Sequence, residues 1–545
     1  MRQIIVFILF FSIFSGVKAQ SQKKPKLVVG IVVDQMCYEY LYRFQDRFSK
    51  KGFLKLMERG TNCRNARYNY VPTFTGPGHA SIYTGTTPEN HGIVANDWFD
   101  RLSKQTINCV GDASVKSVGT SSEDGLCSPT HLKTTTITDQ LKMTYSNSKV
   151  ISMSIKDRGA ILPGGHLSDG SYWYDYATGQ FITSSYFDDK LPDWVINFNG
   201  QKQVDNYLAQ TWNTLYDLST YKECGPDNSP YEITLSGKTN PTFPYNLKEM
   251  CGGKVNYELF TITPFANTYL TDFALNSIAS ENLGKDAETD MLCISYSTPD
   301  IVGHAFGPYS VELEDVYLRL DKELERLITT LEKEVGKNEF VLFLTADHAV
   351  VPVPQDLKDR NLPGGYFFLN ERMTDLKNKV KTKFGEDFIL GQNNLNIYLD
   401  RQAILKKQFS FSDVSEFIAE EIRTWQHVKR VFTADELLKS GSDDEWRDMI
   451  RKGYHPAESG DVIFMLESGY LAKSLDTPEA HKGTSHGSAF NYDTHVPLLW
   501  YGKGIPKQEI FRLTEITDIS PTLTNILNLQ RSGSMTGEPI LELFR

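Results

Sequence analysis

Six side chains of this sequence could bind metal ions around one hydroxyl group. They are three carboxylates and three imidazoles, from Asp34, Asp300, His304, Asp347, His348 and His486. The hydroxyl belongs to Thr75, which opens the stretch Thr-Gly-Pro-Gly-His-Ala-Ser. Two sets of such ligands around one hydroxyl are the inventory of a two-metal phosphoryl-transfer site.

Asp300 and His304 stand four residues apart. On a helical turn this spacing places both side chains on one face, where a carboxylate oxygen and an imidazole nitrogen can bind the same cation. The alternative is a polar i,i+4 pair on a helix surface. Pro299, Gly303 and Gly307 favour a shaped turn after a buried strand over a long surface helix.

Asp34 and the pair Asp347-His348 each follow an apolar run, at residues 27–33 and 340–344. At the end of a strand the chain can turn adjacent side chains toward one ion. Such an aspartate could instead cap the next helix, and an Asp-His pair could be only a hydrogen-bonded turn. Each of these motifs alone could be a metal ligand or a structural turn. All of them together in this order favour metal ligands.

His486 lies in the segment His-Lys-Gly-Thr-Ser-His-Gly, whose small residues allow a ligand to approach closely. His481 and His495 are the competing histidines of this region. We therefore assign the third imidazole to His486.

Thr75 precedes a predicted short helix at residues 77–84, with Pro77 near its start. The simple interpretation is a helix N-cap, a position that threonine favours. Both roles can hold together, because the positive end of the helix dipole and a bound divalent metal would each lower the pKa of the hydroxyl. Thr73 is the alternative nucleophile.

Short apolar runs alternate with helical patterns along the chain, at residues 27–33, 150–155, 291–296, 340–344 and 496–500. Continuous apolar runs predict strands buried on both faces of a mostly parallel sheet. In such sheets ligands bind beyond the carboxyl ends of the strands. We therefore expect the residues after the runs to cluster there, namely Asp34, Lys156, Ser297, Thr345 and Tyr501. The amphipathic segment 312–335 predicts a covering helix.

Two long segments interrupt this alternation. Residues 165–265 are rich in Tyr, Asn, Asp, Gly and Pro, and predict an insertion over the rim of the site. Its aromatic residues Tyr172, Trp173 and Tyr174 either line the mouth of the site or only pack. Residues 355–473 predict a smaller α+β subdomain, with a strand from Asn394 and a helix at 413–425.

Composition is that of a globular protein, with 40% hydrophobic and 23% charged residues in 545. The formal net charge of −11 argues against a general nucleic-acid partner. Residues 1–19 predict a cleaved secretory signal, since the apolar run 4–14 is too short to span a bilayer. The mature chain would be 20–545, periplasmic or secreted, without a membrane span. The oligomeric state stays open, a monomer being slightly favoured.

Seven cysteines fit an exported protein with some disulfides. The candidate pairs are Cys63 with Cys109 and Cys224 with Cys251, whereas Cys293 lies in an apolar run and predicts a buried free thiol. The sequence has no C-x-x-C motif, so metal binding must rest on histidine and carboxylate.

The combined motifs resemble the alkaline phosphatase superfamily over nearly the whole mature chain. The resemblance implies a three-layer α/β/α sandwich around a central mixed sheet, and two zinc ions. By that resemblance Asp300, His304 and His486 hold one zinc, and Asp34, Asp347, His348 and the Thr75 oxygen hold the other. Thr75 also argues against a sulfatase, because threonine cannot yield formylglycine.

Lys156 and Arg158 follow the apolar run 150–155, and in an extended segment both could reach one phosphate. The alternative is a solvated charged turn. This segment and Asn96 resemble the PafA-type bacterial alkaline phosphatases. The resemblance implies an exported monoesterase of broad specificity for small phosphate esters, with a phosphothreonine intermediate and Asn96, Lys156 and Arg158 around the phosphate. The alternatives are a phosphodiesterase or nucleotide pyrophosphatase of the same superfamily, and a catalytically silent binding protein.

Overall fold

The computed structural model describes residues 23–439 and 444–544, so the predicted signal at 1–19 lies outside the described part. A ten-stranded sheet forms its centre, in the order β22-β2-β21-β13-β1-β12-β7-β8-β9-β6. Among the described residues, no helix combines the length and the apolar character needed to cross a membrane.

The central strands are the apolar runs of the sequence. β1 (Leu27–Val33) pairs in parallel with β12 (Asp290–Tyr296) on one side and β13 (Phe340–Thr345) on the other. β7 (Val150–Ser154) continues the parallel order beside β12. Every residue of these four strands is buried, which is why the runs do not alternate with polar residues.

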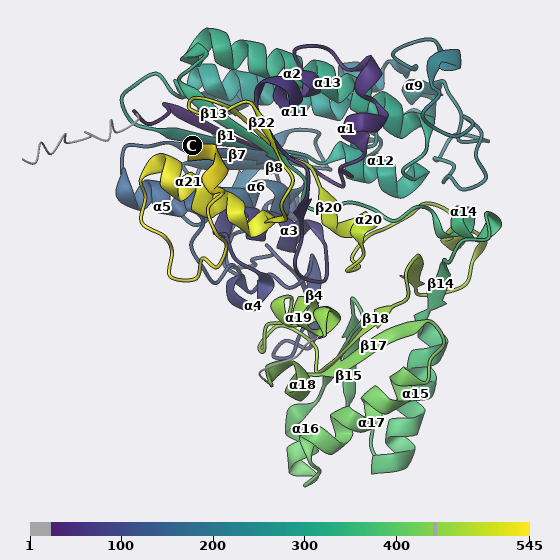
Figure 1. The fold of residues 1–545 in the computed structure, drawn as a ribbon. Coiled ribbons are helices and arrows are strands. Elements are labelled where there is room, and N and C mark those ends of the chain that lie inside the picture. The colour runs from purple at the N-terminus through teal and green to yellow at the C-terminus, as the bar shows by residue number, and fades with distance from the viewer. Residues whose placement is uncertain (1–22, 440–443, 545) are drawn as a thin grey trace, which may run out of the picture.

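Helices cover both faces of the sheet, as Figure 1 shows. α11 (Phe265–Ser280) and α13 (Val311–Leu331) lie on one face. α3 (Thr75–Thr84), α6 (Asp157–Gly164) and α21 (Ile519–Leu527) lie on the other. The predicted α/β fold is therefore confirmed, and the helix predicted at 312–335 is α13 with its continuation.

The direction of one strand differs from the prediction. β21 (Leu498–Gly502) pairs antiparallel with β13, so its carboxyl end lies at the opposite edge of the sheet. Tyr501 is consequently remote from the other strand-end residues, and its hydroxyl donates to Glu332 Oε1 at 2.8 Å. The expectation that Tyr501 joins the site was wrong, because an apolar run predicts a buried strand but not its direction.

The segment predicted as an insertion begins inside the sheet. β8 (Gly170–Tyr174) pairs in parallel with β7, and β9 (Phe181–Ser184) pairs antiparallel with β8. Tyr172, Trp173 and Tyr174 are β8 residues exposed by 2% or less. Of the two interpretations, packing in the core is therefore the correct one. Residues further along cover the sheet from the side of α11 and α13, where Trp212 donates to Asp315 Oδ2 at 2.8 Å.

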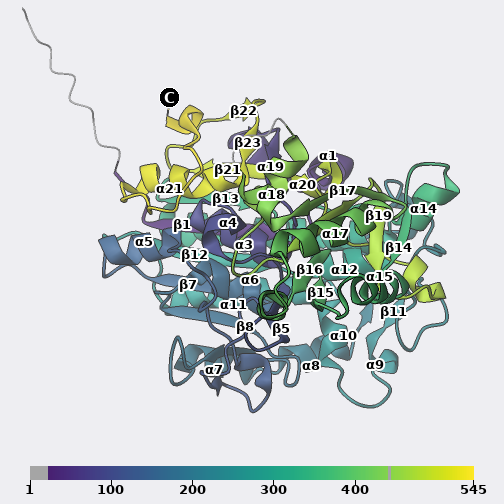
Figure 2. The same cartoon turned by 90° about the horizontal axis from the view of Figure 1, so that it is seen from below.

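We call the described residues of 365–473 the cap, and the rest of the described chain the body. The cap contains a second sheet, with the order β15-β16-β18-β17. Its strands are β15 (Ile389–Asn393), β16 (Asn396–Leu399), β17 (Val428–Thr433) and β18 (Val462–Leu466). α15 (Leu369–Phe384) and α17 (Phe411–Arg423) pack on this sheet around a core of their own. The cap, green in Figures 1 and 2, projects from one side of the body.

The strand predicted from Asn394 begins two residues later. Asn394 and Leu395 have φ of 48° and 62° and form the turn between β15 and β16. This turn docks on the body, where Asn394 Nδ2 donates to the Asp97 carbonyl oxygen at 2.8 Å.

All seven cysteines are free thiols, which corrects both proposed disulfides. Cys63 packs in the core of the large sheet, whereas Cys109 packs in a separate cluster with Trp98. Cys224 makes its contact with the Tyr221 carbonyl oxygen at 3.7 Å instead of with Cys251. Cys293 is buried in β12, as predicted.

Candidate active site and metal centre

Three neighbouring strands deliver five of the six candidate ligands to one edge of the sheet. Asp34 follows β1, and Asp347 and His348 follow β13. β12 leads into α12 (Thr298–Phe306), which carries Asp300 and His304 on its first and second turns. His486 arrives from the loop that follows the cap.

The six side chains form two groups. Asp300, His304 and His486 make one, and Asp34, Asp347 and His348 make the other. Within each group the candidate ligand atoms lie within 4.8 Å of one another. The structure therefore brings together the same two sets that the resemblance implies.

The three imidazoles are oriented by backbone carbonyl groups. Nδ1 of His304 lies 2.8 Å from the Thr484 oxygen, and Nδ1 of His486 lies 2.7 Å from the Thr73 oxygen. Nδ1 of His348 lies 3.0 Å from the Ala349 oxygen. Because Nδ1 donates in each case, the Nε2 lone pair is left for a metal.

Burial keeps two of these rings neutral. It lowers the pKa of His348 to about 3, and it lowers the pKa of His486 well below its usual range. Burial also acts to lower the pKa of His304, but the Asp300 carboxylate, 3.1 Å away, raises it overall. Neutral imidazoles are the form that ligates a metal.

The second group contains carboxylate oxygens that need a partner. Asp34 Oδ1 and Asp347 Oδ2 are buried and have no hydrogen-bond partner among the described residues. Burial raises the pKa of both aspartates, and the repulsion between nearby carboxylates adds to the effect. A divalent cation would satisfy these oxygens and offset the repulsion, so the residues fit a metal.

Thr75 is placed next to the second group. Its Oγ1 lies 3.4 Å from His348 Nε2, and the residue is 1% exposed. α3 begins at Thr75 itself and Phe74 is the N-cap, so the predicted N-cap role of Thr75 was wrong. Gly78 permits this placement, because a Cβ there would overlap the Asp347 carbonyl oxygen.

The alternative nucleophile is committed elsewhere. The Thr73 hydroxyl donates to the Ser488 carbonyl oxygen at 3.0 Å. His481 pairs with Asp476 at 2.7 Å, and His495 Nε2 contacts the Arg64 carbonyl oxygen at 3.0 Å. Neither histidine belongs to either metal group.

Lys156 lies between the two groups. Its Nζ is 2.8 Å from Asp34 Oδ2 and also contacts Asp300 Oδ2. Burial lowers its pKa, but Asp300 and Asp34 together raise the pKa above the usual lysine value. A single buried cation therefore reaches one carboxylate of each group, which a solvated charged turn would not do.

Asn96 and Arg158 flank the same space. Asn96 Oδ1 accepts from the Gly76 amide at 2.7 Å, which sets the side-chain amide beside Thr75. Arg158 stands at the start of α6, where Nη1 contacts Asp157 Oδ1 at 3.3 Å. Its Nε has no partner among the described residues, so the guanidinium keeps donors for an anion.

Gln35 is a site residue that the sequence interpretation missed. Its amide N–H donates to Asp347 Oδ1 at 3.1 Å and its Nε2 donates to Asp300 Oδ1 at 2.6 Å, which links both groups. The backbone there has φ of 63°, a conformation that is uncommon for glutamine. The only available signal was its position directly after Asp34 at a strand end.

Comparisons with known proteins agree with this geometry. The sequence model of the family described as type I phosphodiesterase / nucleotide pyrophosphatase matches residues 28–489. The chain is 40% identical over 527 residues to "Alkaline phosphatase PhoV" of Synechococcus elongatus, covering 96% of this chain and 94% of that protein. It is 38% identical over 530 residues to "Alkaline phosphatase PafA" of Elizabethkingia meningoseptica, covering 96% of each.

A solved structure extends the likeness to three dimensions. The crystal structure of wild-type alkaline phosphatase PafA matches with a TM-score of 0.91 and 37% identity, over 96% of this chain and 99% of that one. The predicted superfamily and fold are thereby confirmed. The chain belongs to the type I phosphodiesterase / nucleotide pyrophosphatase family, in the alkaline phosphatase superfamily, and groups there with PafA and PhoV.

Proposed function

We propose that this hydrolase is an alkaline phosphatase that cleaves phosphate monoesters through a phosphothreonine at Thr75. The observation that carries the proposal is Lys156, whose ammonium contacts Asp34 and Asp300, one carboxylate of each metal group. Asn96 bonds the Gly76 amide beside Thr75, and the charge of Arg158 acts on the Lys156 ammonium. The names of the relatives PhoV and PafA support the same reaction.

The metals we propose are two zinc ions, because carboxylate and imidazole donors in sets of three are typical of catalytic zinc. Asp34, Asp347, His348 and the Thr75 oxygen would hold one, and Asp300, His304 and His486 the other. Bound zinc would supply positive charge near the entering and leaving oxygens of the ester.

The chain's own residues then perform the transfer. Thr75 Oγ1 loses its proton to solvent and attacks phosphorus, the bond to the ester oxygen breaks, and the leaving alkoxide takes up a proton from solvent to give the alcohol. Water next attacks the phosphothreonine, which frees inorganic phosphate and restores the hydroxyl. In both steps Lys156, Arg158 and the Asn96 amide bind the non-bridging oxygens and compensate their charge.

A diesterase is the second candidate, because the matching family is named for diesterases. A monoester dianion carries one more charged oxygen than a diester, and Lys156 and Arg158 supply two cations for it. The test is the ratio of kcat/KM for p-nitrophenyl phosphate to that for bis-p-nitrophenyl phosphate, with the zinc-loaded enzyme. A ratio far above one supports the proposal, and a ratio below one moves the assignment to the diesterase.

We also propose that the enzyme acts outside the cytoplasm, on the strength of the signal-like pattern in residues 1–19. N-terminal sequencing of the chain from expressing cells tests this. A start at Gln20 is expected, and a start at Met1 contradicts the proposal.

A further inference from the structure

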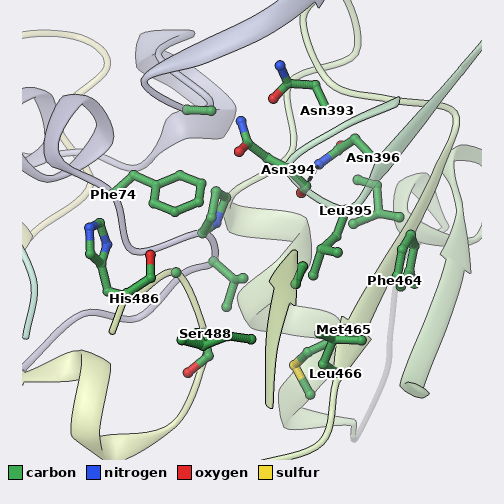
Figure 3. A pocket seen from close by; sticks show the side chains of 18 of the residues that line it. Phe74, Asn393, Asn394, Leu395, Asn396, Phe464, Met465, Leu466, His486 and Ser488 are labelled. Atoms are coloured by element: carbon green, nitrogen blue, oxygen red, sulfur yellow. Dashed lines mark hydrogen bonds between the residues drawn. The ribbon is translucent and has the colours of Figure 1, made fainter. Parts of the chain in front are cut away.

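A cavity of about 450 Å³ lies between the cap and the body, as seen from close by in Figure 3. The body contributes Phe74, Ala95 and His486 to its wall. The cap contributes Asn394 and Leu395 from the turn between β15 and β16, and Met465 from β18. Its volume is within the range of small-molecule sites, which often form where two structural units meet.

The cavity shares its wall with the reaction centre. Phe74 directly precedes Thr75, and its ring meets the His486 ring edge-on with centroids 5.4 Å apart. Ala95 directly precedes Asn96, which positions the Gly76 amide. A substrate whose phosphorus lies at Thr75 would therefore have this cavity within reach of its organic part.

The wall combines apolar faces with polar side chains, among them the amide of Asn394. Phe74, Leu395 and Met465 offer apolar surface. The Asn394 amide nitrogen is engaged with the Asp97 carbonyl oxygen at 2.8 Å, which fixes the side chain and leaves its Oδ1 as an acceptor. Phe74 and Asn394 both line this cavity, and both are labelled in Figure 3. An aromatic face and a fixed amide on the wall of one cavity suit a planar ring with a donor on its edge.

We propose that this cavity binds the alcohol part of the substrate and favours phosphate monoesters whose alcohol carries a planar, hydrogen-bonding ring. The inference rests on the proposed phosphatase activity and adds the substrate class to it. The ring would pack on Phe74 and Leu395 and donate to Asn394 Oδ1. Esters with a short alkyl alcohol would reach the metal groups without this contact.

The test compares adenosine 5′-monophosphate with ethyl phosphate, using the zinc-loaded full chain. Both are esters of primary alcohols, so their leaving groups are alike and differ mainly in the ring. We expect kcat/KM to be about tenfold higher for the ring-bearing ester, the equivalent of burying part of one ring. Equal values for the two esters contradict the proposed role of the cavity but not the proposed phosphatase activity. If neither ester is hydrolysed, the phosphatase proposal itself fails.

Variants of the cap locate the effect. Leu395→Trp, which fills the cavity, should lower the ratio of the two kcat/KM values about tenfold, back toward one. Leu405→Trp is the matched control, because Leu405 is 77% exposed on the same cap and lies outside the cavity wall. If Leu395→Trp does not fold, Leu395→Ala decides, since it removes the apolar contact and should also lower the ratio. A ratio unchanged in the folded variant contradicts the proposal.

Discussion

Two regions of the molecule are built differently: the two metal groups, which stand on the body, and the cap. In the body, adjacent parallel strands end together, and backbone carbonyl groups fix each imidazole within hydrogen-bond distance. The cap has a core of its own and meets the body through side-chain bonds, such as Asn394 on Asp97 and Arg101 on Asp461, and through a shared apolar cluster. The difference teaches that the body determines the chemistry and the cap can change what is bound without disturbing it.

The largest effect should come from the body at Thr75. Thr75→Ala removes the attacking oxygen, and we expect kcat to fall on the order of 10⁴-fold or more. Zinc should stay bound through the ligands Asp34, Asp347 and His348. The melting temperature should change little, because the Thr75 hydroxyl contacts His348 Nε2 only at 3.4 Å. Stopped-flow or long-time assays on p-nitrophenyl phosphate measure the loss. Near-normal turnover would remove Thr75 from the mechanism.

Loss of Lys156 should come next. Lys156→Ala removes the cation that reaches Asp34 and Asp300, and we expect kcat/KM for monoesters to fall on the order of 10²- to 10³-fold. Diesters should lose much less, since they carry one charged oxygen fewer. Lys379→Ala, on the cap surface, is the control. Equal losses for both ester types would reduce Lys156 to a structural role.

Replacing Gln35 should have a smaller effect, because it should act by weakening metal binding. Gln35→Leu keeps the side-chain volume but deletes the donor to Asp300 Oδ1, and we expect zinc affinity to fall about 10- to 100-fold. Competition with a chelator measures that affinity, and added zinc should restore much of the activity. If activity falls while zinc affinity stays the same, Gln35 acts on the substrate instead.

The smallest effect on chemistry should come from the contact between the cap and the body at Asp461. The fully buried Asp461 accepts from Arg101, Arg401 and the Leu399 amide. Asp461→Ala leaves these donors unpaired and should cost about 3 kcal/mol of stability. With ethyl phosphate at a temperature where the variant is folded, kcat should stay within about threefold. A loss as large as that of Lys156→Ala would erase the distinction between cap and body.

The sequence predicted the strand ends better than the connections between them. Asp34, Asp347 and Asp300 follow apolar runs that became β1, β13 and β12, because parallel buried strands leave a clear signature. Tyr501 was misplaced because strand direction depends on tertiary pairing, which the run does not encode. β8 was taken for an insertion because its tyrosines and glycine do not form an apolar run.

The fine positioning within the site was also beyond the sequence. Gln35 acts through a backbone conformation and two hydrogen bonds that only the folded chain creates. The disulfide guesses failed because pairing depends on distance between side chains and not on spacing in the chain. The cavity beside Phe74 forms only where the cap meets the body, so no single segment of the sequence predicts it.

The central claim is that Thr75 carries the phosphoryl group during turnover. Zinc-loaded enzyme is mixed with a fast-reacting aryl phosphate, quenched in acid within milliseconds and digested, and the peptides are analysed by mass spectrometry. The account predicts phosphate on Thr75, at a level that rises with substrate and is absent from Thr75→Ala. Phosphate on Thr73, or multiple turnovers with no phosphorylated residue at any quench time, would contradict it.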